Sequence, residues 1–246
     1  MSSFPMKTPR NIAGPGLVPR RRLLAALVLL GPAAGVVRAA ALDSITNADA
    51  SGALRQALEK GAAAAVSQLG VPGGFSNDPK LRIPLPDGLR QAEKLIRLAG
   101  KGDELDALEA SMNRAAEMAV PQARQMLTNA IRSMSVQDAK GILTGGEDSV
   151  TRFFREKTYT GLTDKFLPEV TKAVGKLGLA QRYNRLAEQG MKFGLVKEEQ
   201  ASVERYVTGK ALDGLYAVIA EQEKAIRANP VQAGGKLLQK VFGAMR

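Results

Sequence analysis

Apolar residues recur at helical spacing through most of the chain. Between residues 46 and 69 they follow one another every three or four positions, which is the repeat of a helix with one buried face. No stretch alternates apolar and polar residues at the two-residue period of a strand. The sequence therefore predicts an all-α protein, a single multi-helix bundle of roughly seven to ten helices. The further helical stretches are residues 87–99, 105–119, 123–131, 137–143, 150–157, 162–177, 183–187, 203–226 and 237–242.

A proline-rich stretch separates the first two predicted helices. Residues 74–89 read GFSNDPKLRIPLPDGL and contain three prolines. A residue that precedes a proline is pushed toward extended backbone geometry. We therefore predict an ordered loop after Gly70, with a short strand-like piece over residues 81–85.

A cap and two glycines mark a corner near the middle of the chain. Ser135 followed by Asp138 resembles a capping box, with Asp in place of the usual Glu, and predicts the start of a short helix. Gly145 and Gly146 predict its end, because glycine adopts the left-handed conformation that closes many helices. On this interpretation the two acidic residues that follow fall in the first turn of the next helix, where negative charge is favourable.

The N-terminal segment has the three parts of a secretory signal peptide. The positively charged stretch Arg20–Arg22 precedes an apolar run of 15 residues, Leu23–Val37, and Ala39–Ala41 offers a small-residue cleavage site. A helix that spans a bilayer needs about 20 apolar residues, so we expect cleavage near Ala41 and no stable transmembrane anchor afterwards. Residues 1–41 are then the signal, and 42–246 form one all-α domain.

This signal predicts a periplasmic or otherwise exported protein. Arginines in front of two leucines resemble a twin-arginine signal, and the general secretory route is the alternative. A third interpretation treats the segment as a buried helical hairpin.

The basic excess of the chain is concentrated in the same segment. The chain has 35 basic and 24 acidic residues, a net charge of +11, but residues 1–41 hold six of the basic residues and none of the acidic ones. The remainder carries a net charge of only +5, so we predict no nucleic-acid partner. Aromatic residues make up 4% of the chain and Trp is absent, which favours helices that pack through small residues.

Histidine and cysteine are absent from the sequence. Their absence excludes Ser-His-Asp triads, thiol nucleophiles, histidine bases, the usual zinc or haem ligation, and acylation on a lipoprotein cysteine. The Gly-Gly pair lacks the GK[ST] sequence of a phosphate loop, and the acids after it lack the spacing of a calcium loop. We therefore predict no cofactor, no metal and no catalytic residue.

Basic residues next to loops are the candidates for contact with an anion. We select Arg82 in the proline-rich loop, and Arg152 and Arg155 after the Gly-Gly pair, because arginine binds carboxylates and phosphates well. The complete candidate ligand-binding set is Arg82, Asp138, Lys140, Gly145, Gly146, Arg152 and Arg155.

Two further features leave alternatives open. Phe153 and Phe154 cannot both face one direction, so either both rings pack between helices under the arginine stems, or one stays near the surface as a protein or lipid contact. The basic, amphipathic C-terminal stretch GGKLLQKVFGAMR is either a terminal helix docked on the bundle or a helix on a membrane surface.

Three long stretches of the chain resemble a known bacterial family. NDPKLRIPLPDGL, MSVQDAKGILTGGEDSVTRFFREKT and KALDGLYAVIAEQEKAIRANP, in this order after a signal peptide, are similar to the family catalogued as domain of unknown function 4197. The resemblance covers about Leu42 to Met245. It implies a secreted or periplasmic helical protein and assigns no catalytic residue.

Three classes of function follow. The first is a non-enzymatic exported helical protein that binds an apolar or anionic ligand, such as a lipid-like molecule, or a partner in the envelope. The second is a carboxylate-dependent cell-wall hydrolase that uses paired acids, Glu147 with Asp148 or Glu198 with Glu199. The third is a structural or assembly protein of the envelope.

Overall fold

The computed structural model describes residues 47–192, 202–232, 235, 236 and 239. Every regular element within these residues is a helix, so the predicted all-α class is confirmed. The predicted signal segment and most of the predicted last helix lie outside the described residues. The elements are α2 (Asn47–Leu69), α3 (Asp87–Leu98), α4 (Gly102–Ala119), the 3-10 turn η1 (Val120–Gln122), α5 (Ala123–Arg132), α6 (Val136–Thr144), α7 (Ser149–Lys176), α8 (Leu179–Lys192) and α9 (Val203–Ala228).

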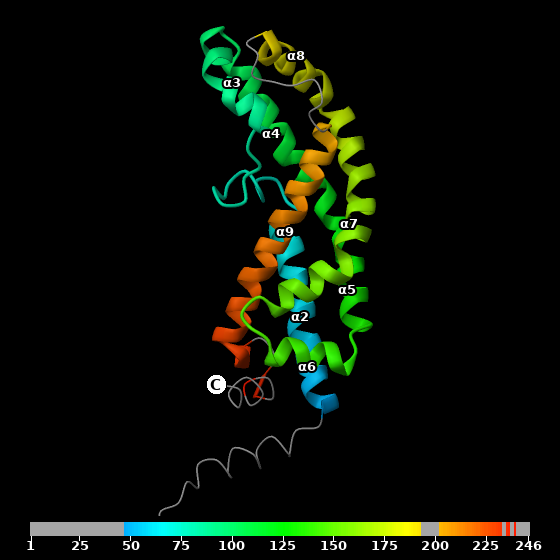
Figure 1. Cartoon of the computed structure of the whole chain (residues 1–246). Coiled ribbons are helices and arrows are strands. Elements are labelled where there is room, and N and C mark those ends of the chain that lie inside the picture. The colour runs from blue at the N-terminus through cyan, green and yellow to red at the C-terminus, as the bar shows by residue number, and fades with distance from the viewer. Residues whose placement is uncertain (1–46, 193–201, 233–234, 237–238, 240–246) are drawn as a thin grey trace, which may run out of the picture.

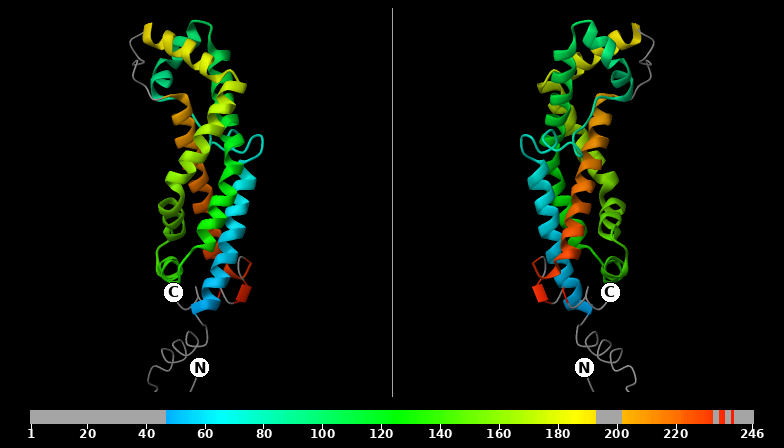
Figure 2. Two further views of the ribbon diagram at one scale, coloured as in Figure 1. Left: turned by 90° about the vertical axis from the view of Figure 1, so that its right-hand side faces the viewer. Right: turned by 90° about the vertical axis from the view of Figure 1, so that its left-hand side faces the viewer.

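Helices α2, α4, α5, α7 and α9 form the body of an elongated bundle (Figures 1 and 2). Helix α9 packs on α2, α4 and α7, and α5 packs on α2 and α7. Helices α3 and α8 pack on each other and on α4 at one end of the bundle, while α6 packs on α2 and α7 at the other end (Figure 1). The two ends therefore present different helices to a partner.

Small side chains bring the helices of the core together. Short side chains allow helix axes to approach closely, and larger rings such as Phe154, Phe166 and Tyr216 fill the wider gaps. This arrangement agrees with the packing predicted from the low aromatic content. The alanines with no exposed surface are Ala57, Ala65, Ala92, Ala115, Ala116, Ala119, Ala123, Ala173 and Ala211.

The proline-rich loop, residues 70–86, is part of the core. Phe75 has no exposed surface and Ile83 is 1% exposed. The Phe75 ring lies against Gly214 of α9, where an added Cβ would come within 2.6 Å of its Cε1 atom. A glycine at this position is needed for the α9 backbone to accept the ring. The predicted ordered loop is confirmed.

Two buried polar side chains of α4 bind the backbone of this loop. The amide of Asn113 accepts a hydrogen bond from the Ile83 N–H and donates one to the Ile83 carbonyl, both at 2.9 Å. The Glu117 carboxylate accepts from the N–H groups of Gly73 at 3.0 Å and Phe75 at 3.4 Å. These bonds satisfy backbone groups that would otherwise be buried without partners. The strand-like piece predicted over residues 81–85 forms no strand: Leu81 and Arg82 donate to the Asp78 carbonyl in a turn, and the Ile83 backbone pairs with the Asn113 side chain.

The turn between α6 and α7 differs from the prediction. Gly145 ends α6 with φ −78° and ψ 169°, an extended conformation instead of a left-handed one. A glycine is required there for space, because an added Cβ would come within 2.6 Å of the Gly141 carbonyl oxygen and the Ser149 Cβ. Helix α7 begins at Ser149, with Asp148 as its N-cap residue, so the predicted placement of Glu147 and Asp148 in its first turn is wrong.

Helix α7 joins the two helical stretches predicted on either side of residue 160. It runs without interruption for 28 residues, with Pro168 inside it. Phe153 and Phe154 are 7% and 1% exposed, and their rings meet edge to face at a centroid distance of 5.5 Å. The interpretation in which both rings pack between helices is confirmed.

Candidate functional site

The structure separates Arg82 from the other predicted anion contacts. Loop 70–86, which carries Arg82, and α7, which carries Arg152 and Arg155, project on opposite sides of the bundle in both views (Figures 1 and 2). The Arg82 guanidinium donates to the Ser76 carbonyl oxygen, at 3.0 Å from Nε and 2.8 Å from Nη2. Arg82 therefore stabilises its own loop and belongs to no common site with the α7 arginines.

Asp138 is bound within the predicted capping box. Its carboxylate accepts from the Ser135 N–H at 2.9 Å, and the Ser135 Oγ accepts from the Asp138 N–H at 3.0 Å. Lys157 of α7 lies 3.7 Å from the other carboxylate oxygen. The hydrogen bonds from the Ser135 backbone and hydroxyl, with a smaller contribution from Lys157, lower the pKa of Asp138. The carboxylate thus stabilises the start of α6 and ties α6 to α7.

Replacement Ser135→Ala should destabilise the protein by about 0.5–2 kcal/mol, the usual cost of losing an N-cap hydroxyl. Because the folded-state pKa of Asp138 lies below its ordinary value of 3.8, this carboxylate stabilises the fold above that pH. The contribution is lost as the pH falls through the lowered folded-state pKa. The carbonyl-carbon NMR titration of Asp138 should shift toward higher pH in the Ser135→Ala variant. An unchanged titration would show that Ser135 does not hold the carboxylate.

Arg155 is held against aromatic rings at the seam between α7 and α9. Its guanidinium carbon lies 4.7 Å from the ring centroid of Tyr216 and 5.8 Å from that of Tyr159, and the two rings stack at 6.3 Å. Asp213 of α9 lies 3.8 Å from the guanidinium. These contacts orient Arg155 toward α9, so its side chain connects α7 to α9.

The remaining predicted residues lie around the α6–α7 turn. Arg152 is paired with Asp148, its neighbour one helical turn earlier, at 3.3 Å, and both side chains are well exposed. Lys140 is exposed on α6 and makes no ion pair with a described residue. Gly146 has room for a side chain, because an added Cβ would meet only the Asp148 side chain at 3.6 Å. None of these residues lines a hollow described in the structure, whose walls are formed by other residues.

A buried carboxylate beneath this turn was not anticipated from the sequence. Glu223 of α9 is 1% exposed. It accepts from the backbone N–H groups of Val150 at 3.0 Å and Thr151 at 3.1 Å, and from the Thr151 hydroxyl at 3.0 Å. The free N–H groups and the positive dipole end of α7 are thus satisfied by a side chain from another helix.

Arg227 completes this cluster. It donates to the Glu223 carboxylate from Nε at 3.1 Å and from Nη2 at 3.0 Å. Nη2 also contacts the Ser149 Oγ at 2.6 Å and the Ile142 carbonyl oxygen at 3.1 Å, and the Ser149 Oγ donates to that carbonyl at 2.9 Å. The last turn of α6 is therefore capped by side chains, which explains why Gly145 does not need the left-handed conformation.

The described acids give little support to a carboxylate mechanism. Glu147 and Asp148 are exposed on the turn, and Glu198 and Glu199 lie outside the described residues. The two buried glutamates, Glu117 and Glu223, are engaged by backbone N–H groups and arginine, so their role is structural. Burial raises the pKa of Glu109. The acids around it, Glu93 and Asp106, are both bound to Arg97.

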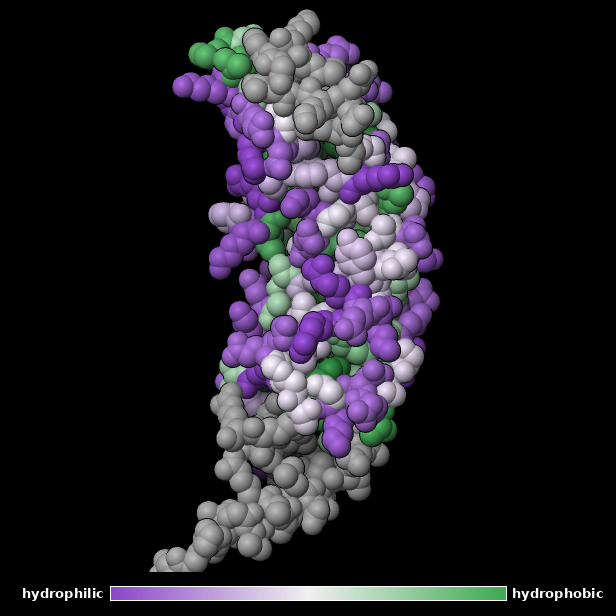
Figure 3. Space-filling model, viewed as in Figure 1, coloured by the Kyte–Doolittle hydropathy of each residue, from purple (hydrophilic) through white to green (hydrophobic). Residues whose placement is uncertain are grey.

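The outer face of α3 exposes two leucines, of which the helical pattern places Leu95, with Leu89, Ala92 and Ile96, on the buried face. Leu89, Ala92 and Ile96 are fully buried, as predicted, but Leu95 is 39% exposed and Leu98 is 76% exposed. The prediction that Leu95 is buried is wrong. Helices α4 and α8 pack against the side of α3 that carries Leu89, Ala92 and Ile96, and they leave Leu95 exposed. Figure 3 shows hydrophobic atoms gathered at this end of the molecule, where α3 ends. No partner within the described chain covers Leu98.

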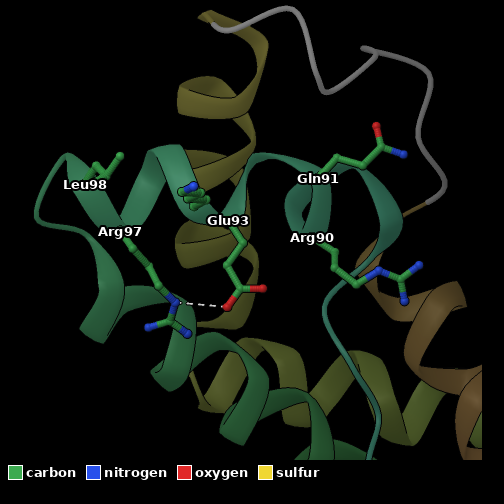
Figure 4. A pocket seen from close by; sticks show the side chains of 6 residues that line it. Arg90, Gln91, Glu93, Arg97 and Leu98 are labelled. Carbon is green, nitrogen blue, oxygen red and sulfur yellow. Dashed lines mark hydrogen bonds and ion pairs between the residues drawn. The ribbon is translucent and has the colours of Figure 1, made fainter.

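Charged side chains line the α3 surface together with Leu98. A hollow of about 480 Å³ lies on this face (Figure 4). The Arg97 guanidinium is held by Glu93 at 2.9 Å and by Asp106 at 2.6 Å, and the hydrogen bond from Arg97 lowers the pKa of Asp106. Lys94 makes no ion pair with a described residue. The residues that line the hollow are Arg90, Gln91, Glu93, Lys94, Arg97 and Leu98.

The described residues contain no group of three or more acidic side chains placed to bind a metal ion. Over the same residues, no helix combines the length and the apolar character that crossing a membrane requires.

Comparison with known proteins gives one match. The family model described as "Protein of unknown function (DUF4197)" matches residues 44–243. No curated protein and no solved structure matches the chain. The match begins just after the cleavage site predicted near Ala41.

Proposed function

This chain belongs to the DUF4197 family, and we propose that it is an exported protein of the cell envelope that acts by binding another protein through the outer face of α3. The N-terminal pattern supports export, since residues 1–41 have the basic, apolar and small-residue parts of a signal peptide. The family match that starts at residue 44 agrees with a mature protein that starts near residue 42.

The exposure of Leu98 is the observation that carries the binding proposal. Scattered apolar residues on a surface are normal, but Leu95 and Leu98 are both exposed and lie three residues apart, a spacing that makes them neighbours on a helix surface. Burial of a leucine side chain contributes about 1.5–3 kcal/mol. A partner that covers both leucines therefore gains a few kcal/mol from them, which is one part of the free energy that specific binding needs.

The polar surroundings indicate what kind of partner fits. An apolar centre with a charged rim, in which arginine is enriched, is the usual anatomy of a protein interface. Arg90 and Arg97 are already neutralised by Asp87, Glu93 and Asp106, while Lys94 is not paired within the described chain. The partner should present an apolar groove with an acidic residue opposite Lys94.

The balance of charges around α3 does not favour a lipid surface. Between Asp87 and Asp106 the chain carries four basic and five acidic residues. Anionic lipids attract segments with a clear basic excess, which this face lacks. An envelope protein is therefore the occupant that the charges support.

Site-specific photocrosslinking tests the proposal. A photoreactive amino acid at position 98 should capture one defined protein in the envelope, and the same amino acid at Val71, which is 48% exposed in loop 70–86, should not. After the captured protein is identified by mass spectrometry and purified, Leu98→Glu should weaken its affinity by about 10–100-fold. Lys94→Glu should weaken it as well.

Matched controls decide the outcome. Val71→Glu and Lys140→Glu change exposed residues away from α3 and should leave the affinity unchanged. Equal capture from positions 71 and 98, or equal affinity of the Leu98→Glu protein, would refute α3 as the binding face. N-terminal sequencing of the protein from the periplasm should begin near Leu42; retention of residues 1–41 in the cytoplasm would refute export.

A further inference from the structure

A second polar hollow is lined by residues of η1, α5 and α7. Helix α5 and the part of α7 beside it lie away from α3 (Figure 1). The volume of this hollow is about 250 Å³. Gln122, at the end of η1, and Gln125 and Asn129 of α5 are spaced at i, i+3 and i+7, so they share one helix face. Lys165 of α7 lines the same hollow. We propose that this hollow, called the amide crevice below, binds an acidic saccharide unit.

Helices α5 and α7 pack closely beside the amide crevice, at Met126, one of its lining residues. Met126 of α5 lies against Gly161 of α7, where an added Cβ would come within 3.1 Å of the methionine sulfur and methyl carbon. Glycine therefore allows the two helices to approach, and the partly buried Met126 supplies an apolar part of the lining. A saccharide ring has C–H faces that suit such a surface.

The polar groups of the amide crevice have no partners within the described protein. The side chains of Gln122, Gln125, Asn129 and Lys165 make no hydrogen bond or ion pair with a described residue. On the α3 face, Arg90 and Arg97 are ion-paired and Lys94 is not paired with a described residue. The four polar side chains of the crevice are exposed, so water binds their polar groups and a ligand can replace that water.

The chemistry of the lining selects the class of ligand. Each amide offers two N–H donors and one carbonyl acceptor, and lysine offers three donors and a positive charge. No carboxylate lines the crevice: Asp164 is not part of the lining, and Glu169 is bound to Lys172 at 2.8 Å. Amides match the hydroxyl groups of a sugar, and the Lys165 ammonium matches a carboxylate on the same molecule.

The size of the crevice limits the ligand to one small unit. Ligand pockets usually have volumes of about 300–1,000 Å³, so a hollow of about 250 Å³ holds a single sugar ring or one ring of a longer chain. Binding of one exposed unit of this kind has a dissociation constant on the order of 1 mM. A longer saccharide gains affinity only from contacts outside the crevice.

NMR titration of the uniformly labelled full-length protein tests the proposal. Glucuronate should shift the side-chain amide resonances of Gln122, Gln125 and Asn129, with a dissociation constant on the order of 1 mM. Glucose, which has the ring without the carboxylate, and acetate, which has the carboxylate without the ring, should each bind at least about fivefold more weakly. A parallel titration uses N-acetylmuramic acid. Tighter binding of this sugar would indicate that the natural ligand comes from peptidoglycan, and tighter binding of glucuronate would indicate a polysaccharide that contains uronic acid.

Variants separate a specific site from weak general binding of anions. Lys165→Gln should weaken glucuronate binding about fivefold, the scale of one exposed charge pair, and leave glucose binding unchanged. Lys176→Gln, which removes a lysine at the far end of α7, should change neither. If both acidic sugars fail to shift these amides, if acetate binds as well as glucuronate, or if Lys165→Gln binds normally, the proposal is wrong.

Discussion

Replacement of Arg227 by methionine should lower the free energy of unfolding by about 3–5 kcal/mol, the usual cost of leaving a buried charge without its partner. Arg227 is the cation that pairs with Glu223, and the two side chains are 16% and 0% exposed. Its loss also takes donors away from the Ile142 carbonyl and the Ser149 hydroxyl. Urea unfolding, followed by circular dichroism, measures the change.

A double variant shows whether the charge or the packing is responsible. Arg227→Met combined with Glu223→Gln removes both charges, so it should recover part of the stability lost in Arg227→Met. Lys224→Met changes an exposed residue one helical turn before Arg227 and should change the free energy of unfolding by less than about 0.5 kcal/mol. A loss of less than about 1 kcal/mol in Arg227→Met would show that Glu223 is not held as the structure describes.

Replacement of Phe75 by alanine should destabilise the protein by about 3–5 kcal/mol, as is typical when a fully buried aromatic ring is removed from a core. The ring has no exposed surface and fills the space above Gly214. Its loss also loosens loop 70–86, because the Phe75 N–H is one of the groups that Glu117 binds. Thermal unfolding measures the stability of the variant.

Limited proteolysis detects the local effect of Phe75→Ala. Cleavage after Lys80 or Arg82 should become much faster in the variant, since both residues lie in the loop that the ring holds in place. Val71→Ala, at a residue 48% exposed in the same loop, should leave the rate and the stability nearly unchanged. Equal cleavage rates in the Phe75→Ala and unaltered proteins would show that the ring does not order the loop.

Local features of the fold were predictable from short stretches of sequence. The capping box depends on Ser135 and Asp138, which lie three residues apart, so the sequence contains both partners of each hydrogen bond. The order in loop 70–86 was predictable for a similar reason, because each proline restricts its own neighbour. The buried side of α3 was harder to predict, since Leu95 and Ile96 both fit the helical repeat and the positions of α4 and α8 decide between them.

The sequence did not show which of the candidate residues lie together in one site. Arg82, Arg152 and Arg155 were selected together because each is a cation near a loop, yet the structure engages Arg82 in its own loop and Arg155 in the α7–α9 seam. The α3 face and the amide crevice were missed. The i, i+3, i+7 spacing of Gln122, Gln125 and Asn129 was a usable signal, but nothing in it indicated that Lys165 lies opposite.

The sequence by itself determined the helical class, the positions of most helices, the cap of α6 and the absence of histidine and cysteine chemistry, because these depend on composition or on neighbours within about one helical turn. Only the tertiary structure decided how the helix ends and buried backbone groups are satisfied. Glu223 caps a helix that begins 74 residues before it, and Asn113 binds a loop residue 30 positions away. Such pairs leave no local pattern, since each partner alone is an ordinary polar residue on an amphipathic helix or loop, and packing brings the two together.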